Sequence, residues 1–202
     1  MPSNGTTTEA TLRVYEATAH SYVDRTTGVD MSEEQEFFLE RLPRVVDARV
    51  LDAGCGSGRD ALAFARRGLA VEAFDGSAVM ASLAAKTLGS PVHVLRFDQV
   101  VWENRFDGIW ACASLLHLDD AGLEAALKRL YRALRPGGIL CAVMKVGQGS
   151  EAAADGRFYR YTDIEDLSAQ MQKAGLHSLE WRTATSHLRS DSTMWLTMAG
   201  RR

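Results

Sequence analysis

The sequence predicts an α/β fold in which a mostly parallel sheet carries helices on both faces. Short apolar segments recur along the chain, as at 49–52, 70–74 and 92–95. Helical patterns separate these segments, and a glycine-rich loop at 54–58 joins the first of them to the first helix. Strands that alternate with helices are typical of parallel sheets. We therefore expect a seven-stranded sheet that is parallel apart from its last strand.

The glycine-rich loop is suited to a ligand that lies against the backbone. It reads Asp52-Ala53-Gly54-Cys55-Gly56-Ser57-Gly58 and leads directly into the helical pattern 59–68. Glycine has no Cβ, so it tolerates positive φ and allows close approach to the main chain. A strand, a glycine-rich loop, a helix and a second strand form the βαβ unit that binds nucleotides.

Spacing and charge separate two classes of nucleotide cofactor. A dinucleotide fingerprint, G-x-G-x-x-G, would put its third glycine at position 59, where this chain has Arg59. The Asp52 carboxylate would repel a pyrophosphate, but it would attract the α-ammonium of an amino acid joined to adenosine. We therefore expect S-adenosyl-L-methionine as the cofactor, with a nicotinamide-dependent oxidoreductase as the weaker alternative.

Acidic residues also follow the second and third strands. Asp75 comes directly after 70–74, about 20 residues past the glycines, where a carboxylate accepts both ribose hydroxyls of an adenosine. Asp98 follows 92–95, where a carboxylate could accept a hydrogen bond from the adenine amino group. Each acid alone is typical of a solvent-exposed loop. Three acids at successive strand ends favour a nucleotide site.

These motifs resemble those of the class I S-adenosylmethionine-dependent methyltransferases, and the resemblance covers nearly the whole chain. Residues 51–58 (LDAGCGSG) are similar to the first motif of that family and 73–77 (AFDGS) to its second. Residues 106–117 (FDGIWACASLLH) are similar to its fourth strand and the following loop, and 134–140 (LRPGGIL) to the turn into its fifth strand. The likeness is strongest to small bacterial members grouped with tellurite-resistance-like and ubiquinone- or menaquinone-type methyltransferases. It implies a Rossmann-like fold and methyl transfer.

The resemblance also implies that two N-terminal helices, 9–24 and 32–42, fold over the cofactor. It carries over Tyr15, Tyr22 and Arg25 as contacts, with Arg25 as a bidentate partner of the methionine carboxylate. Packing of the tyrosines on the sheet is an open alternative. The expected cofactor contacts are Tyr15, Tyr22, Arg25, Asp52, Gly54, Cys55, Gly56, Gly58, Asp75, Gly76, Ser77, Met80, Asp98, Ala111 and Ala113.

Methyl transfer requires an acceptor atom held behind the methyl group, and a base only where the acceptor must lose a proton. His117 is the candidate base because its loop follows the fourth strand and imidazole titrates near neutral pH; a packing role stays open. The polar, glycine-rich start of 147–161 and its aromatic and basic end predict a substrate lid, with a plain surface loop as the alternative. The candidate acceptor contacts are His117, Arg157, Tyr159 and Tyr161.

Other patterns narrow the class of acceptor. A net charge of −3 without a basic stripe argues against nucleic acid as a partner. The segment 111–114 (ACAS) differs from the [DNS]-P-P-[YFW] motif of methyltransferases that act on exocyclic base amines, so we expect a small molecule. Oxygen, nitrogen, carbon, sulfur or a heavier chalcogen all remain open as the methylated atom. Cys55, Cys112 and Cys141 lack metal-site spacing, so no metal is expected, and a soft metalloid substrate is a minor alternative.

At 202 residues and 46% hydrophobic, the chain suits one domain, 1–202. We expect residues 1–8 to be disordered, 9–42 to cover the cofactor, 49–145 to form the cofactor-binding core and 147–161 to form the lid. No segment reads as a signal peptide or membrane span, so we expect a cytoplasmic monomer or homodimer. A cofactor-binding protein without catalysis is the alternative to an enzyme.

Overall fold

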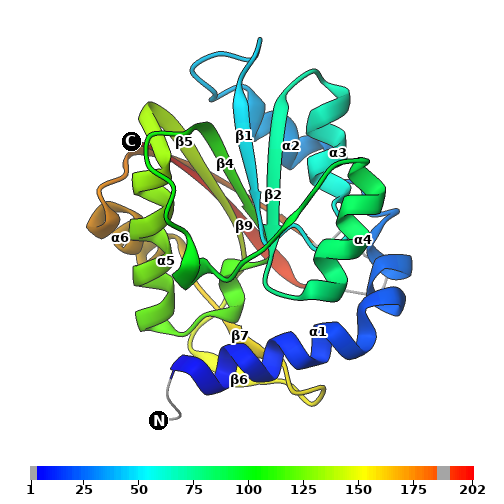
Figure 1. The fold of residues 1–202 in the computed structure, drawn as a ribbon. Coiled ribbons are helices and arrows are strands. Elements are labelled where there is room, and N and C mark those ends of the chain that lie inside the picture. Colours follow the sequence, from blue (N-terminus) through cyan, green and yellow to red (C-terminus); the bar gives the residue numbers. More distant parts are fainter. Residues whose placement is uncertain (1–3, 186–191) are drawn as a thin grey trace.

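The computed structural model describes residues 4–185 and 192–202, which form a seven-stranded sheet between two layers of helices (Figure 1). The strands of this sheet are β1 (Arg49–Ala53), β2 (Ala70–Asp75), β3 (His93–Val94), β4 (Phe106–Cys112), β5 (Leu134–Lys145), β8 (His177–Thr185) and β9 (Met194–Arg201). The helices are α1 (Asn4–Thr26), α2 (Ser32–Leu39), α3 (Arg59–Arg66), α4 (Ala78–Leu88), α5 (Asp120–Ala133) and α6 (Ile164–Ala174). Two short 3-10 turns, η1 (Phe97–Gln99) and η2 (Leu115–His117), follow β3 and β4.

The strand order is β3-β2-β1-β4-β5-β9-β8. Neighbouring strands from β3 to β5 are parallel, whereas β9 runs antiparallel to both β5 and β8. The order reverses between β1 and β4, which is the point where open α/β sheets form a crevice at their carboxyl edge. The prediction of a mostly parallel sheet with one antiparallel last strand is confirmed.

The central strands are buried on both faces, which explains their continuous apolar sequences. Leu51, Ile109 and Leu140 belong to a core cluster shared with α5 and α6. Val50 and Trp110, which alternate with them along β1 and β4, belong to a second cluster shared with α2 and α3. Because successive side chains of a strand point to opposite faces, the sheet separates two hydrophobic cores.

Side-chain caps set where the helices on the α5 face begin. The Asp119 carboxylate accepts from the Gly122 N–H at 2.8 Å in the first turn of α5, and Asp163 accepts from the Asp166 N–H at 2.9 Å in the first turn of α6. These bonds satisfy backbone donors that the helix itself leaves without a partner. The apolar stripe of α5 then lies against the sheet.

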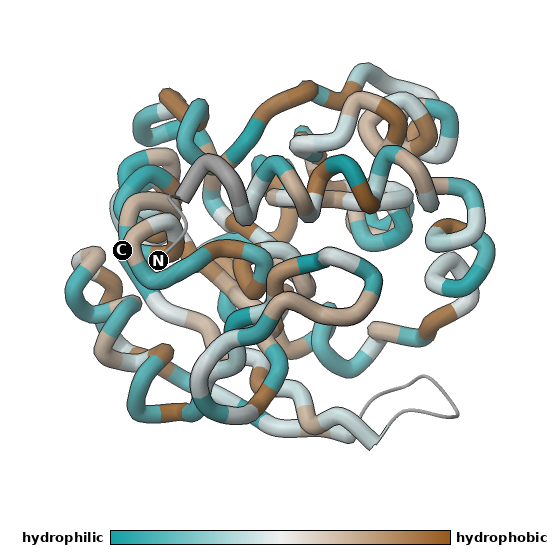
Figure 2. Tube along the Cα trace, turned by 90° about the horizontal axis from the view of Figure 1, so that it is seen from below, coloured by the Kyte–Doolittle hydropathy of each residue, from teal (hydrophilic) through white to brown (hydrophobic). Residues whose placement is uncertain are grey.

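One end of the sheet is covered by α1 and by a hairpin of β6 (Ser150–Ala152) and β7 (Phe158–Arg160) (Figure 1). Figure 2, which views the molecule from that end, shows α1 and this hairpin side by side in front of the sheet. The Phe158 N–H donates to the Thr11 hydroxyl at 2.9 Å, so the two segments are bonded directly. The covered end is the one at which the parallel strands finish.

One boundary differs from the expectation from sequence, and one segment has a structure that was not expected. Helix α1 already begins at Asn4, so residues 4–8 are helical rather than disordered; residues 1–3 lie outside the described residues. Tertiary packing of α1 over the loop after β2 supports a helix that its threonine-rich start would not favour alone. The segment 147–161 contains the β6–β7 hairpin, whose turn uses Gly156 with a φ of +90°.

Candidate functional site

A cavity of about 810 Å³ lies at the carboxyl ends of the parallel strands, beneath α1 and the β6–β7 hairpin. Its wall includes residues at or next to the carboxyl ends of four strands: Asp52 of β1, Asp75 of β2, Cys112 of β4 and Lys145 of β5. A volume of this size accommodates a cofactor or a drug-sized molecule. The topology therefore brings the acidic strand ends and the glycine loop to one enclosed site.

The first two glycines of the loop have different surroundings. Gly54 has a φ of +76°, and a Cβ added there would lie 2.5 Å from the Ser114 Cβ, so the loop packs tightly against the segment after β4. Gly56 has a φ of +53°, and the nearest atom to an added Cβ is the Tyr22 Cε1 at 3.7 Å. A Cβ at Gly56 would therefore fit in ordinary contact with the Tyr22 ring, and its absence allows a ligand to approach the backbone there.

Asp75 is held between the glycine loop and the start of α4. Its two carboxylate oxygens accept from the Gly56 and Ser77 N–H groups, each at 2.9 Å. Burial raises the pKa of Asp75 to about 6, and these two hydrogen bonds act in the opposite direction. Each oxygen keeps a further acceptor position. The carboxylate is therefore a fixed acceptor on the cavity wall.

Asp52 lines the same wall but is buried more deeply. Its carboxylate accepts from the Ala61 N–H at 3.0 Å in the first turn of α3. Burial, followed by the nearby Asp60 carboxylate, raises the pKa of Asp52 well above its usual range. A cationic group in the cavity beside Asp52 would lower the pKa of Asp52 again, because an opposite charge favours the ionised carboxylate.

A buried network centred on Asp60 was not anticipated from the sequence. Asp60 binds the Arg59 guanidinium in bidentate fashion, at 2.8 and 2.9 Å, and also accepts from Gln35 Nε2 and Trp110 Nε1 at 2.9 Å each. The pKa of Asp60 is lowered, since these donors outweigh the effect of its burial. Arg59 lines the cavity in this fixed orientation, whereas Arg25, the expected arginine, is exposed on the rim.

Another part of the cavity wall is apolar. Phe97 of η1 packs edge-on against Phe74, with ring centroids 5.2 Å apart, and both line the cavity together with Met80 and Leu12. Asp98 also lines this end, but its side chain is 62% exposed and pairs with Arg96 through two contacts of 3.0 Å. Phe97 and Leu12 were not anticipated, because isolated apolar residues in a loop or a helix have no distinctive pattern.

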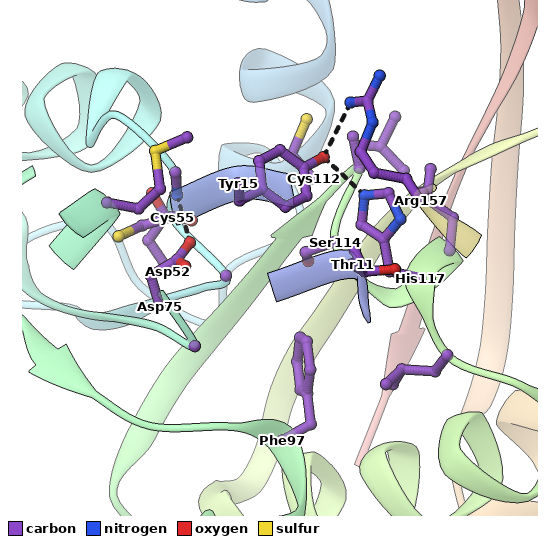
Figure 3. A pocket seen from close by; sticks show the side chains of 18 of the residues that line it. Thr11, Tyr15, Asp52, Cys55, Asp75, Phe97, Cys112, Ser114, His117 and Arg157 are labelled. Atoms are coloured by element: carbon purple, nitrogen blue, oxygen red, sulfur yellow. Dashed lines mark hydrogen bonds between the residues drawn. The ribbon is translucent and has the colours of Figure 1, made fainter. Parts of the chain in front are cut away.

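His117 and Tyr15 form the centre of a hydrogen-bonded cluster (Figure 3). The Phe158 carbonyl lies 2.7 Å from His117 Nδ1, and the Tyr15 hydroxyl lies 2.7 Å from Nε2. A carbonyl only accepts, so Nδ1 carries the proton and the Tyr15 hydroxyl donates to Nε2. The Arg157 Nη1 donates to the same hydroxyl at 3.4 Å. Residues from α1, η2 and the hairpin thus meet at one point.

The surroundings of His117 bear on its expected role as a general base. Burial, with smaller contributions from the Arg157 and Lys145 charges, lowers the pKa of His117 to about 4. The ring is therefore a weaker base than a free imidazole, and both nitrogens are engaged in hydrogen bonds. In this geometry His117 joins Tyr15 of α1 to the hairpin, and its role as a base stays a prediction.

Four of the expected site residues lie outside the cavity lining. Gly58 and Ser77 precede α3 and α4; a Cβ added at Gly58 would lie 3.1 Å from the Ala84 Cα, and Ser77 caps α4. Ala111 points into the core beneath α5, because its neighbours along β4 face the other way. Tyr161 donates to Glu151 at 2.5 Å, away from the cavity. The remaining expected residues line the cavity: Tyr15, Tyr22, Arg25, Asp52, Gly54, Cys55, Gly56, Asp75, Gly76, Met80, Asp98, Ala113, His117, Arg157 and Tyr159.

The three cysteines are free thiols. Cys55 and Cys112 line the cavity, and Cys141 lies in the core beneath α2. Burial raises the pKa of all three thiols, so they are protonated at neutral pH. Within the described residues, no group of three or more His, Cys, Asp or Glu side chains is arranged to hold a metal ion. A search of the same residues finds no helix with the length and apolar character to cross a membrane.

Comparisons with known proteins agree with this geometry. Residues 50–138 match the family model described as a methyltransferase domain. The chain is 36% identical over 104 residues to malonyl-[acyl-carrier protein] O-methyltransferase of Enterobacter lignolyticus, an alignment that covers 50% of this chain and 41% of that protein. The chain spans about half the length of the curated relatives it matches.

Solved structures establish the fold. The chain superposes with a TM-score of 0.84 on 1,6-didemethyltoxoflavin-N1-methyltransferase of Burkholderia thailandensis, at 22% identity over 100% of this chain and 91% of the other. It superposes with a TM-score of 0.77 on the [4+2]-cyclase SpnF, at 20% identity over 97% of this chain and 96% of the other. At these identities the likeness is one of architecture.

Proposed function

We propose that this chain, whose residues 50–138 match the family model of a methyltransferase domain, transfers a methyl group from S-adenosyl-L-methionine to a small-molecule acceptor. The observation that carries the proposal is the pairing of Asp75 with the backbone of Gly56 on the wall of the cavity. The carboxylate lies 2.9 Å from the Gly56 nitrogen, and a Cβ added at this glycine would meet only the Tyr22 ring, at 3.7 Å. A ribose and a methionine tail need this combination of a fixed acceptor and a main chain without a side chain in the way.

The residues of the cavity fit the parts of this cofactor. Asp75 accepts hydrogen bonds from the ribose hydroxyls, and the apolar end at Phe97 receives the adenine. Asp52 faces the α-ammonium, while Arg59 and Arg25 provide cations for the methionine carboxylate. The bound cofactor supplies an electrophilic methyl group on a sulfonium. This assignment leaves the end of the cavity at Tyr159 and Lys145 for the acceptor.

The contribution of the protein to the transfer is mainly one of position. The acceptor atom must lie in line behind the methyl group, and such orientation contributes on the order of 7–11 kcal/mol to lowering the barrier. His117 and Tyr15 support this role, because their hydrogen bonds fix α1 and the hairpin over the cavity. Closure of the site also excludes water from the reacting groups.

A small molecule is favoured over a polymer because the cavity is covered. Helix α1 and the β6–β7 hairpin lie over its opening and are bonded to one another through Thr11 and Phe158. The similar proteins include one named malonyl-[acyl-carrier protein] O-methyltransferase and one named 1,6-didemethyltoxoflavin-N1-methyltransferase. Likeness to tellurite-resistance-like or quinone-type methyltransferases, a cytoplasmic location and a monomeric or dimeric state stay predictions.

The alternative is a cofactor-binding protein without methyl transfer. The structure named a [4+2]-cyclase is an example of the same fold in a protein whose name is not that of a methyltransferase. Two measurements test the proposal. S-adenosylhomocysteine should raise the melting temperature while nicotinamide dinucleotides should not, since a ligand that binds the native state alone stabilises it by about 2.7 kcal/mol at a hundredfold excess over Kd. Labelled S-adenosylmethionine should then transfer its methyl group to a member of a small-molecule panel. Cofactor binding without transfer to any acceptor would support the alternative.

A further inference from the structure

The sheet ends at β8, whose outer edge faces away from the rest of the sheet. Among the described residues β8 pairs with β9 alone, and it is the last strand in the order of the sheet. Trp181 lies in the middle of this strand and is 50% exposed. An edge strand presents unpaired N–H and C=O groups, which are a template for pairing with another strand. The outer edge of β8 is therefore a candidate interaction surface.

The alternation of backbone groups identifies the residues of β8 that face this edge. In β9 the Met194 carbonyl accepts from the N–H that follows β5, at 2.8 Å, so Met194 and every second residue after it bond toward β5. The residues between them, such as Thr197, bond toward β8, where Thr197 lies opposite Arg182. Bonding directions alternate along an antiparallel strand, so Trp181 and Thr183 turn their N–H and C=O groups to the outer edge.

A second copy of the chain fits this edge in one register. In antiparallel pairing about a twofold axis, outward-facing residues must lie opposite one another. With Trp181 on the axis, the two copies of Trp181 exchange both backbone hydrogen bonds, and Glu180 of each copy lies opposite Arg182 of the other. Registers centred on Glu180 or Arg182 place like charges on the axis, and one centred on Thr183 pairs Arg182 with Ala184. The register centred on Trp181 therefore gives the best match of charge.

The two charged side chains already have partners within the chain, and this arrangement extends those pairs. Glu180 Oε2 accepts from Arg41 Nη2 at 2.7 Å, and Arg182 pairs with Glu33 of α2. The Glu180 and Arg182 side chains are still 58% and 32% exposed. Across the axis they would continue a row of alternating charge. Opposite charges that face each other on paired strands stabilise a sheet, and like charges destabilise it.

The other face of β8 provides an aromatic contact at the same axis. Trp181 lies opposite Met198 of β9, and Met198 belongs to the core cluster shared with α5 and α6. Side chains that are directly opposite in a sheet share a face, so Trp181 lies on the α6 face. In the dimer the two indole rings meet there. Aromatic pairs across strands stabilise a sheet, and tryptophan is enriched at the centres of protein interfaces.

From these features we infer that the chain forms a twofold homodimer through β8, in which two seven-stranded sheets join into one continuous sheet with Trp181 on the axis. Strand β8 is parallel to β5, because both run antiparallel to β9. The twofold axis therefore places the two cavities at opposite edges of the joined sheet, and each copy keeps a complete site. The β8–β9 ladder is irregular between His177 and Glu180, which keeps the new pairing short. We expect a dimer with a dissociation constant in the micromolar range.

Sedimentation velocity over a range of protein concentrations tests the dimer. The parent chain should change from a monomer to a species of twice its mass as the concentration rises. Trp181→Pro should abolish this change, because proline removes an N–H that the β8–β9 ladder does not use and that the dimer needs. Trp181→Val keeps that N–H and suits a strand, so it should weaken the dimer by less than Trp181→Pro.

Two charge-reversed variants test the register. Glu180→Arg places arginine opposite Arg182 of the second copy, and Arg182→Glu places glutamate opposite Glu180. Each variant alone should dimerise at least about tenfold more weakly than the parent. An equimolar mixture of the two has opposite charges on both sides of the axis and should form a mixed dimer more tightly than either variant alone. Each variant loses a contact within its own chain, but that loss is the same alone and in the mixture.

Three results would overturn the inference. A parent chain that stays monomeric at every concentration would leave the β8 edge to a different chain or to none. A dimer that survives unchanged in folded Trp181→Pro would use another surface. Charge-reversed variants that associate no better in the mixture than alone would contradict the register, and this comparison decides the matter where Trp181→Pro does not fold. The melting temperature of each variant establishes that it is folded.

Discussion

The affinity for S-adenosylhomocysteine should depend on pH through Asp75. Burial raises the pKa of this carboxyl from 3.8 to about 6 in the empty site. The ribose hydroxyls need the ionised form, because a protonated carboxyl cannot accept from both of them. At pH 5 only about one tenth of the Asp75 side chains are ionised, against nearly all at pH 7. We therefore expect binding to be about tenfold weaker at pH 5 than at pH 7, or about 1.4 kcal/mol.

Titration calorimetry between pH 5 and pH 7.5 measures this dependence, and Asp75→Asn is the control. The variant should bind more weakly at pH 7, by about 1.5–3 kcal/mol, because it loses a charge-assisted acceptor. The variant should also lose the tenfold change in affinity between pH 5 and pH 7. Asp52, whose pKa burial also raises, titrates in both proteins, so the comparison isolates Asp75. An affinity that does not change with pH in the parent, or an equal change in Asp75→Asn, would refute the assignment of Asp75 to the ribose.

Three further predictions use other features of the cavity. In chemical denaturation, Gly54→Ala should lower the free energy of unfolding by about 1–3 kcal/mol more than Gly68→Ala does. Both glycines have positive φ, but only a Cβ at position 54 would meet Ser114. Equal losses in the two variants would contradict the tight contact between Gly54 and Ser114. The pKa of His117 falls from 6.5 to about 4 on folding, so the stability that its neutral ring contributes is present above pH 6.5 and is lost as the pH falls to 4. The free energy of unfolding should drop by about 3 kcal/mol over that range, and it should drop by less in His117→Gln. Arg157→Ala should leave the affinity for S-adenosylhomocysteine nearly unchanged and reduce turnover of the acceptor by at least about tenfold, whereas a parallel loss of both would place Arg157 in the cofactor site.

The glycine loop and the acidic strand ends were predictable because their signals are local. The glycines at 54–58 each need a special backbone conformation, and Asp75 occupies a fixed position relative to them along the chain. Strand and helix positions followed from apolar periodicity over segments of several residues. These parts of the site depend on residues close together in the sequence, so a pattern reveals them.

Contacts between distant segments had no such signal. Trp110 and Gln35 both bind Asp60, although 50 and 25 residues separate them from it. The Tyr15 and His117 contact joins residues 102 positions apart, and it occupies one ring nitrogen of the candidate base. The hairpin strands are too short to show an alternating pattern. Their pairing depends on packing against α1, which the order of residues in 147–161 does not encode by itself.

The bonds between α1 and the hairpin have a consequence for the rate at which the spent cofactor leaves. Thr11 binds Phe158 and Tyr15 binds His117, so the cover over the adenosine end is tied to the cover over the acceptor end. We expect the methylated product and S-adenosylhomocysteine to leave after the same motion, in which α1 and the hairpin move apart. Their release should then limit steady-state turnover even when methyl transfer itself is fast.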